Sequence, residues 1–168
     1  MMFSNIQKIT PNTYQLFEDN KNLGTISSYT NDYHNKYLYL KFNLLSYPSY
    51  SPFPTISQTE GRRLQVMVDS SEESLIHFLT RNDFQLKRRC FSPVVSKIDL
   101  KHPLKANLKL HKFDHQDERY LDCCSFLYDY YKKTHAPVSP LTAPRDTFIK
   151  EVPTKTGYYH LTDNIIDN

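Results

Sequence analysis

Residues 63–91 read RLQVMVDSSEESLIHFLTRNDFQLKRRCF and contain the pattern that decides the fold. Leu64 to Val68 is a short, β-rich apolar run, which predicts a buried strand. The run from Asp69 to Ser71 supplies side-chain oxygens that can cap a helix start, and Ser70 to Glu73 has the spacing of a capping box. An apolar stripe at roughly helical period follows, with Phe78 at its edge, so we expect a helix that lays one face on a sheet. The stripe consists of Leu75, Ile76 and Leu79.

Asn82 and Asp83 are predicted to end this helix, because both residue types tolerate the left-handed backbone that a helix C terminus often needs. Residues 84–91 then predict a second strand. Its apolar contributors are Phe84, Leu86 and Phe91. The whole stretch is therefore predicted to be strand, helix, strand.

The chain before this stretch is rich in β pattern. Strands are predicted at residues 12–18, 22–30 and 36–45, with short polar turns between them. Such short connections join only antiparallel neighbours, so the three strands should form a meander. Residues 46–54, SYPSYSPFP, predict a proline-rich loop, because neither a helix interior nor a central strand tolerates this composition.

This order of elements resembles the C-terminal signature of the GNAT superfamily of acyl-CoA-dependent N-acetyltransferases. In that signature an apolar strand and a capped helix precede a Gly-Phe pair that opens the next strand. Phe84 stands at the Phe of that pair, and Asp83 replaces the Gly. Leu79 stands where many family members place the Tyr that protonates the departing CoA thiolate, and leucine has no proton to donate. The resemblance therefore implies the fold more strongly than the reaction.

The family also carries a pyrophosphate-binding loop of the form Gln/Arg-x-x-Gly-x-Gly/Ala. Residues 58–63, QTEGRR, match its first two fixed positions and place Arg63 where Gly or Ala is expected. The alternative is a short turn into the next strand. Under the resemblance, Gln58, Gly61 and Ser71 are the candidates for contacts with acetyl-CoA, which would be the co-substrate.

The second half of the chain starts again with a strand. A linker is predicted at residues 92–103, a strand at 107–113 and a helix at 114–133. A short second helix at 142–149 and a strand at 158–161 complete the pattern.

Strand, helix, helix, strand is also how GNAT domains begin. The resemblance therefore implies a degenerate GNAT-like unit at residues 1–101, followed at residues 102–168 by the first elements of a second, incomplete unit. The fold class that we predict is α/β, of the α+β kind, with a mixed and mainly antiparallel sheet flanked by helices.

Composition narrows the classes of partner. Of the 168 residues, 39% are hydrophobic and 14% aromatic, as in a folded chain, and the three Gly are few for a backbone that cradles phosphates. The net charge of +3 is small for a nucleic-acid binder, so we expect no nucleic-acid partner. Lys87 to Arg89 is the densest basic run; it predicts a solvated strand edge or, alternatively, an electropositive surface for polyanions or the phosphates of CoA. No apolar run reaches the roughly 18 residues of a membrane helix, so no membrane partner is expected.

Cysteine and histidine positions favour neither a metal site nor a disulfide. Cys90, Cys123 and Cys124 lack metal-type spacing, and the adjacent pair is predicted to be reduced and near a core, as in a cytoplasmic protein. His135 follows a Lys-rich helix end and is a candidate general base or substrate contact, or alternatively a helix cap. Tyr131, one turn earlier, is a second catalytic candidate, or alternatively a packing residue.

Two function hypotheses remain. In the first, the protein transfers an acetyl group from acetyl-CoA to an amine, which is a small molecule, a protein N terminus or a lysine. In the second, it is a non-catalytic or truncated GNAT-like module that serves as an interaction or structural domain. A sheet with an open edge can also join two copies as a homodimer.

Overall fold

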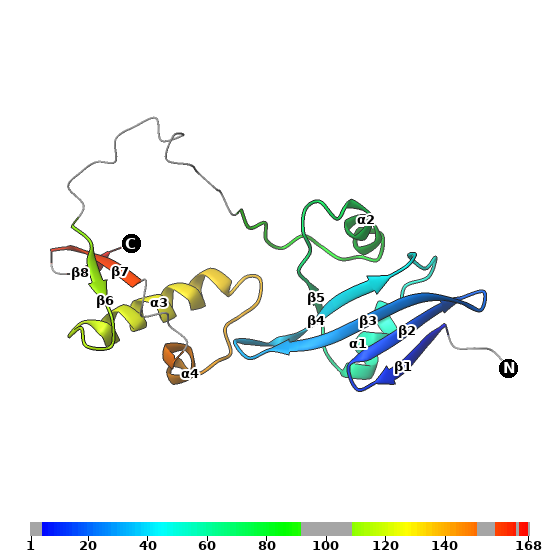
Figure 1. The fold of residues 1–168 in the computed structure, drawn as a ribbon, viewed down its shortest axis with the longest axis horizontal. Helices are drawn as coiled ribbons and strands as arrows, with labels where there is room; N and C mark the ends of the chain where they lie inside the picture. The colour runs from blue at the N-terminus through cyan, green and yellow to red at the C-terminus, as the bar shows by residue number, and fades with distance from the viewer. Residues whose placement is uncertain (1–4, 92–108, 151–156, 164, 168) are drawn as a thin grey trace, which may run out of the picture. The chain divides into compact units, whose positions relative to one another are not determined.

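The structure is a computed structural model that describes residues 5–91, 109–150, 157–163 and 165–167 (Figure 1). The chain divides into two compact units, Met1–Leu86 and Lys87–Asn168, and the fold class is mixed α+β with mainly antiparallel pairing. The predicted boundary after residue 101 and the predicted linker fall outside the described residues.

The first unit is built on a five-stranded sheet in the order β1-β2-β3-β4-β5. The first four strands form an antiparallel meander, and β5 pairs parallel to β4. The strands are β1 Ile6–Thr10, β2 Thr13–Glu18, β3 Lys21–Asn31, β4 His34–Leu44 and β5 Leu64–Val66. The predicted meander is confirmed. The predicted buried strand from Leu64 to Val68 is formed only as far as Val66 and is only partly buried, and Met67 and Val68 are exposed. Strand β1 is an additional strand that the sequence pattern did not reveal.

The β2–β3 connection shows why the meander forms where it does. Asp19 and Asn20 lie between the paired residues Glu18 and Lys21, and both have positive φ, at 48° and 63°. Two consecutive residues of this kind make the type I′ turn whose twist matches that of a hairpin. Asp and Asn tolerate this backbone better than other non-glycine residues, so the local sequence stabilises the turn.

Helix α1, Phe53–Glu60, begins with the last two residues of the predicted proline-rich loop, so the prediction that residues 46–54 exclude a helix was wrong at Phe53 and Pro54. Pro52 is the N-cap and Pro54 sits in the first turn, where a missing N–H costs nothing because no carbonyl precedes it in the helix. The loop itself is confined to residues 45–52. Gly61 closes the helix with φ +63°, and its N–H donates to the carbonyl of Ser57.

Helix α2, Glu73–Arg81, confirms the predicted helix but not its capping box. No side chain caps its start. Asp69 instead accepts hydrogen bonds from the Ser71 amide at 2.9 Å and the Ser71 hydroxyl at 2.6 Å, which fixes a turn ahead of the helix. The predicted end is confirmed, because the helix stops at Arg81 and Asp83 adopts φ 66°.

The predicted strand at residues 84–91 is not formed, since residues 85–91 are neither helix nor strand. Phe84 remains with the first unit, where its ring centre lies 4.7 Å from that of Phe53. Leu86 and Phe91 are 74% and 80% exposed. The β pattern of this segment therefore lacks a pairing partner among the described residues.

Both helices and the sheet share one core. Phe53 of α1 packs against Phe78 of α2, with ring centres 5.4 Å apart. The buried residues of this core are Tyr14, Leu16, Leu23, Ile26, Leu38, Leu40, Phe53, Ile56, Leu75, Phe78 and Leu79. Leu75 and Leu79 of the predicted stripe thus lie in the core, as amphipathic spacing requires, and Phe78 takes the place of Ile76, which is only partly buried.

The second unit has the predicted order of strand, helix, helix and strand, followed by one further strand. Its elements are β6 His111–Phe113, α3 Tyr120–His135, α4 Arg145–Lys150, β7 Gly157–Thr162 and β8 Ile165–Asp167. The three strands are antiparallel in the order β6-β7-β8. Helix α3 begins later than predicted because Asp114 and Asp117 each accept a backbone N–H two residues ahead, which makes turns in place of a first helical turn.

One polar cluster joins α1 to the first two strands. The Glu60 carboxylate accepts hydrogen bonds from the Lys8 ammonium at 2.7 Å and from the Tyr14 hydroxyl. These two donors, Lys8 first, hold the pKa of Glu60 below its ordinary value. Burial, followed by the bond to Glu60, raises the pKa of Tyr14, whose side chain is almost wholly buried.

We expect Gly24→Ala to destabilise the first unit strongly. Gly24 has φ +112°, and an added Cβ would meet the backbone carbonyl oxygen of Asn43 on β4. Backbone cannot move aside as a side chain does, so the loss in unfolding free energy should exceed the strain term of about 1–2 kcal/mol alone. Urea unfolding followed by circular dichroism measures it. Gly61→Ala is the control, because that Cβ meets nothing within 4 Å; equal losses would contradict the close approach.

We expect Glu60→Gln to destabilise the first unit at neutral pH and to matter less in acid. Because the folded pKa of Glu60 is lowered, its carboxylate contributes stability above the ordinary carboxyl pKa, and this contribution is lost as the pH falls through the folded value. Urea unfolding of the variant and of the unchanged protein is compared at about pH 7, where a carboxyl group is ionised, and at about pH 3, where it is largely protonated.

Tyr14→Phe is the companion variant, since it keeps the buried ring and removes only the hydroxyl. It should cost about 1.5–3 kcal/mol at neutral pH, the usual range for a bond to a charged group. A Glu60→Gln penalty of the same size at both pH values would contradict the role assigned to the carboxylate.

Candidate functional site

A shallow cleft opens in the first unit where β4 extends beyond β5. The two strands pair only from Leu38 to Leu40, and β4 continues to Leu44. Two adjoining hollows, of about 390 and 460 Å³, share Tyr47, Glu73 and Ser74. The first is also lined by His77, Phe78 and Arg81, and the second by Phe42, Leu44, Ser71, Glu72 and Leu75. The cleft therefore joins the end of β4, the 45–52 loop and α2.

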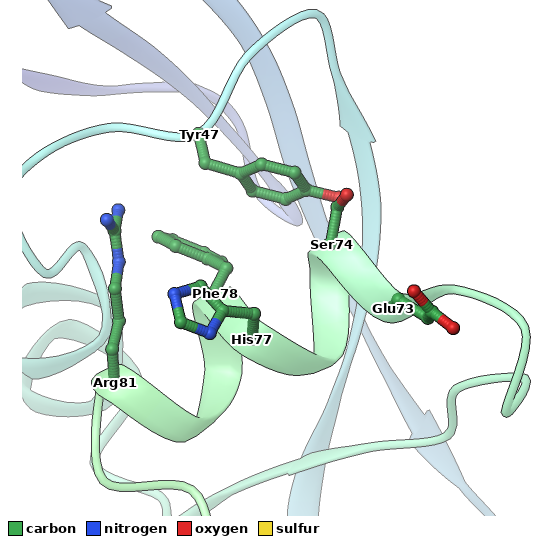
Figure 2. A pocket seen from close by; sticks show the side chains of 6 residues that line it. All are labelled: Tyr47, Glu73, Ser74, His77, Phe78 and Arg81. Atoms are coloured by element: carbon green, nitrogen blue, oxygen red, sulfur yellow. The ribbon is translucent and has the colours of Figure 1, made fainter.

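Figure 2 shows how the side chains that line the first hollow are arranged. Tyr47 reaches from the loop across α2 toward its N-terminal end, and its ring centre lies 5.0 Å from that of Phe78. Arg81 stands beside Phe78, with its guanidinium 5.2 Å from the ring centre. Glu73 points outward at the start of the helix. Aromatic faces thus form the floor and one wall of the cleft.

The 45–52 loop is held by hydrogen bonds that use its own polar groups. Arg81 donates to the carbonyl of Pro48. The Ser49 amide donates to Glu18 at 2.9 Å, the Ser49 hydroxyl donates to the same oxygen, and both bonds lower the pKa of Glu18. The Tyr50 hydroxyl donates to the carbonyl of Asn5 at 2.6 Å. The loop is therefore positioned by internal contacts that leave few of its donors for a ligand.

Charge is distributed unevenly along the cleft. Glu72 and Glu73 are exposed at the start of α2, where carboxylates are favourable for the helix dipole. At the other end, Arg81 is already bonded to the loop. The carboxylates of Glu72 and Glu73 attract cations, and Tyr47, 38% exposed, adds an aromatic ring to the lining of the same cleft. An anion would be repelled at the same place.

The predicted cofactor contacts are not gathered into one site. Gln58 lies within α1, and Gly61 closes its C-terminal end. A helix C terminus presents carbonyl oxygens and partial negative charge, the reverse of a phosphate site. Ser71 does line the cleft, but its hydroxyl donates to Asp69 at 2.6 Å. Acetyl-CoA therefore receives no support from these three positions.

The two catalytic candidates of the second unit do meet, as neighbours on α3. The ring centres of Tyr131 and His135 lie 3.8 Å apart in a stacked arrangement. His135 Nδ1 is 3.0 Å from the carbonyl of Tyr131, and Nε2 is 3.0 Å from a guanidinium nitrogen of Arg88. Since Arg88 only donates, Nε2 accepts and Nδ1 carries the proton. Both ring nitrogens are thus engaged, which is the pattern of a structural histidine.

The paired cysteines of α3 are buried, as predicted. Cys123 and Cys124 are 2% and 0% exposed and form no disulfide. Burial raises the pKa of the Cys123 thiol to about 11, and it raises that of Cys124 as well. Both are therefore protonated at neutral pH and poor nucleophiles.

Within the described residues, no three His, Cys, Asp or Glu side chains gather as metal ligands. No helix among the described ranges combines the length and apolar character needed to cross a membrane.

No protein-family model, curated protein or solved structure matches this chain.

Sequence reasoning did not find the cleft. Glu72 and Glu73 were interpreted only as helix-start residues, and Tyr47 belonged to a loop with no assigned role. Their meeting depends on a loop that folds over α2 from more than twenty residues away in sequence, and no local pattern encodes such a contact. The available signal was the aromatic content of the proline-rich loop.

We expect the three thiols to react in two classes. Cys90 is exposed and should react with Ellman's reagent within minutes at neutral pH, while Cys123 and Cys124 should react only when the second unit opens. The absorbance of the released reagent thiolate, measured under native conditions and in denaturant, counts the thiols in each class. The variant Cys90→Ser should abolish the fast phase alone; a remaining fast phase would contradict the burial of the pair.

Proposed function

We propose that the chain is a non-catalytic GNAT-like module whose first unit binds a cationic group of a partner. The observation that carries this proposal is the closed 45–52 loop between β4 and α1. GNAT-like topology is supported by the order of β4, loop, α1, β5 and α2, in which α1 occupies the place of the helix that the family puts after its phosphate loop.

The loop does not suit the phosphates of CoA. It contains no glycine, Pro48 and Pro52 lack N–H donors, and Pro54 removes another donor from the first turn of α1. Phosphate cradles are built from several free backbone N–H groups that converge. Here the Ser49 amide is already bonded to Glu18. A CoA pyrophosphate would therefore find few backbone donors and, without glycine, little room for close backbone approach.

The proton donor that acyl transfer needs is also missing at its family position. Leu79, at the position of the family's proton donor, is buried in the core of the first unit. A leucine at this position cannot protonate a departing thiolate. The acidic end of the cleft, with Glu72 and Glu73, favours an ammonium or guanidinium group. A module that binds an amine but transfers no acyl group accounts both for the leucine at the proton-donor position and for the acidic end of the cleft.

We expect acetyl-CoA to bind too weakly for detection by isothermal titration calorimetry, up to a concentration on the order of millimolar. With a lysine-containing peptide present, no CoA thiol should be released. Micromolar binding of acetyl-CoA, or release of thiol, would sink the non-catalytic proposal and favour the acetyltransferase.

Binding of a cationic group is tested separately. The lysine-containing peptide is titrated into isotopically labelled protein, and the amide chemical shifts are followed by NMR. Shifts should centre on the 45–52 loop and the first turn of α2. Glu72→Gln/Glu73→Gln should weaken binding at least several-fold, because the carboxylates are removed without loss of volume. The matched control Asp32→Asn, at an exposed turn on the same unit, should leave affinity unchanged. Equal weakening in both would count against the cleft.

A further inference from the structure

The last residues of β4 have one backbone edge that none of the described strands covers. Strand β5 pairs with β4 only as far as Leu40, opposite Val66, whereas β4 continues to Leu44. The hollow of about 460 Å³ lies beside this stretch, since Phe42 and Leu44 both line it. An uncovered strand edge presents backbone N–H and C=O groups with which another chain can pair.

The pairing with β3 shows which backbone groups face this edge. The Leu45 N–H donates to the carbonyl of Leu23, at the end of the β3 ladder, at 2.8 Å. Residues along an antiparallel strand bond to their neighbour at every second position, and the register with β3 is regular over this stretch. Asn43 therefore also bonds to β3. The backbone groups of Phe42 and Leu44, which alternate with these, point to the opposite side, where β5 has ended.

These backbone groups border the cleft without a partner. In the described parts of the chain, no hydrogen bond reaches the N–H or C=O of Phe42 or Leu44 on this side. Both residues are only partly buried. A segment in extended conformation can bond to these groups by pairing as a further strand, which is a common way for a sheet edge to hold a peptide.

The lining of the cleft indicates which side chains such a segment would carry. In an added strand, every second side chain points to the same face as Phe42 and Leu44. These two side chains and Leu75 offer apolar surface there, and Glu72 and Glu73 lie exposed at the start of α2. One position on this face therefore suits an apolar side chain. A neighbouring position suits a lysine or arginine, which the two carboxylates attract.

We propose that the partner of the first unit is an extended peptide segment that adds to β4 as a strand and places a basic side chain beside Glu72 and Glu73. This inference rests on the proposed binding of a cationic group, and it adds the backbone pairing at Phe42 and Leu44. A free amine, or a basic side chain on a folded surface, would satisfy the carboxylates but not the strand edge.

Two peptides of about seven residues, a usual strand length, test the pairing. Both carry lysine, valine and lysine on one face and threonine on the other, and in the second peptide the central amides are N-methylated. N-methylation keeps the charges and the side chains but removes the N–H groups that would donate to the carbonyls of Phe42 and Leu44. In NMR titrations of the full chain, the methylated peptide should bind at least about tenfold more weakly.

Amide hydrogen exchange provides a readout at the edge itself. In the free protein, the N–H groups of Phe42 and Leu44 should exchange faster than that of Asn43, which faces β3. Saturation with the unmodified peptide should slow exchange at Phe42 and Leu44 by about tenfold or more and leave Asn43 unchanged. Asn43 is thus the internal control for a general change in stability.

The outcomes separate this inference from the proposed function. Equal binding of the two peptides, or no slowing of exchange at Phe42 and Leu44, would overturn the strand pairing and leave the cationic site in place. If neither peptide binds, both proposals fail. Glu72→Gln/Glu73→Gln should weaken both peptides by the same factor, because it removes charge and leaves the strand edge intact. A loss confined to the unmodified peptide would contradict the separate roles of the carboxylates and the edge.

Discussion

The short parallel pairing of β5 with β4 is the constraint on which the first unit depends. Parallel neighbours cannot be joined by a tight turn, so the chain must leave the sheet after Leu44 and return at Leu64. Helix α1 provides the return, and its Phe53 and Ile56 enter the core beside the residues of α2. The bonds from Glu60 to Lys8 and Tyr14 then fix the end of this crossover to the opposite side of the meander. Without that crossover, neither helix would have a place against the sheet.

The candidate site is a consequence of the same pairing. Because β5 pairs only with Leu38 to Leu40 in the middle of β4, the C-terminal end of β4 extends beyond it and lines the cleft together with the 45–52 loop and α2. The prolines that let the loop reach the start of α1 also remove the backbone donors that a phosphate would need. The carboxylates at the start of α2 add a charge that attracts cations. One local geometry thus both creates the cleft and selects the kind of group that it accommodates.

The second unit differs from the first in its smaller core and in one long-range contact between Arg88 and His135. Its core is small and includes two protonated thiols, and its polar turns delay the start of α3. The contact of Arg88 with His135 brings the segment after the first unit to the end of this helix. His135 and Tyr131, which sequence reasoning marked for chemistry, serve in that contact.

The sequence by itself determined the elements whose signals are local: the meander with its Asp19-Asn20 turn, the amphipathic α2 with its stop at Asp83, and the order of elements in the second unit. Those features depend on side-chain alternation, on helical spacing and on residues that tolerate positive φ, all of which can be read from a few neighbouring positions. Tertiary structure alone decided the rest. Prolines at the start of α1 became acceptable because the first turn needs no donor, Asp69 bonded Ser71 instead of capping α2, and residues 84–91 stayed unpaired because strand formation requires a partner. The cleft likewise exists only because the fold brings together residues that lie far apart in the chain.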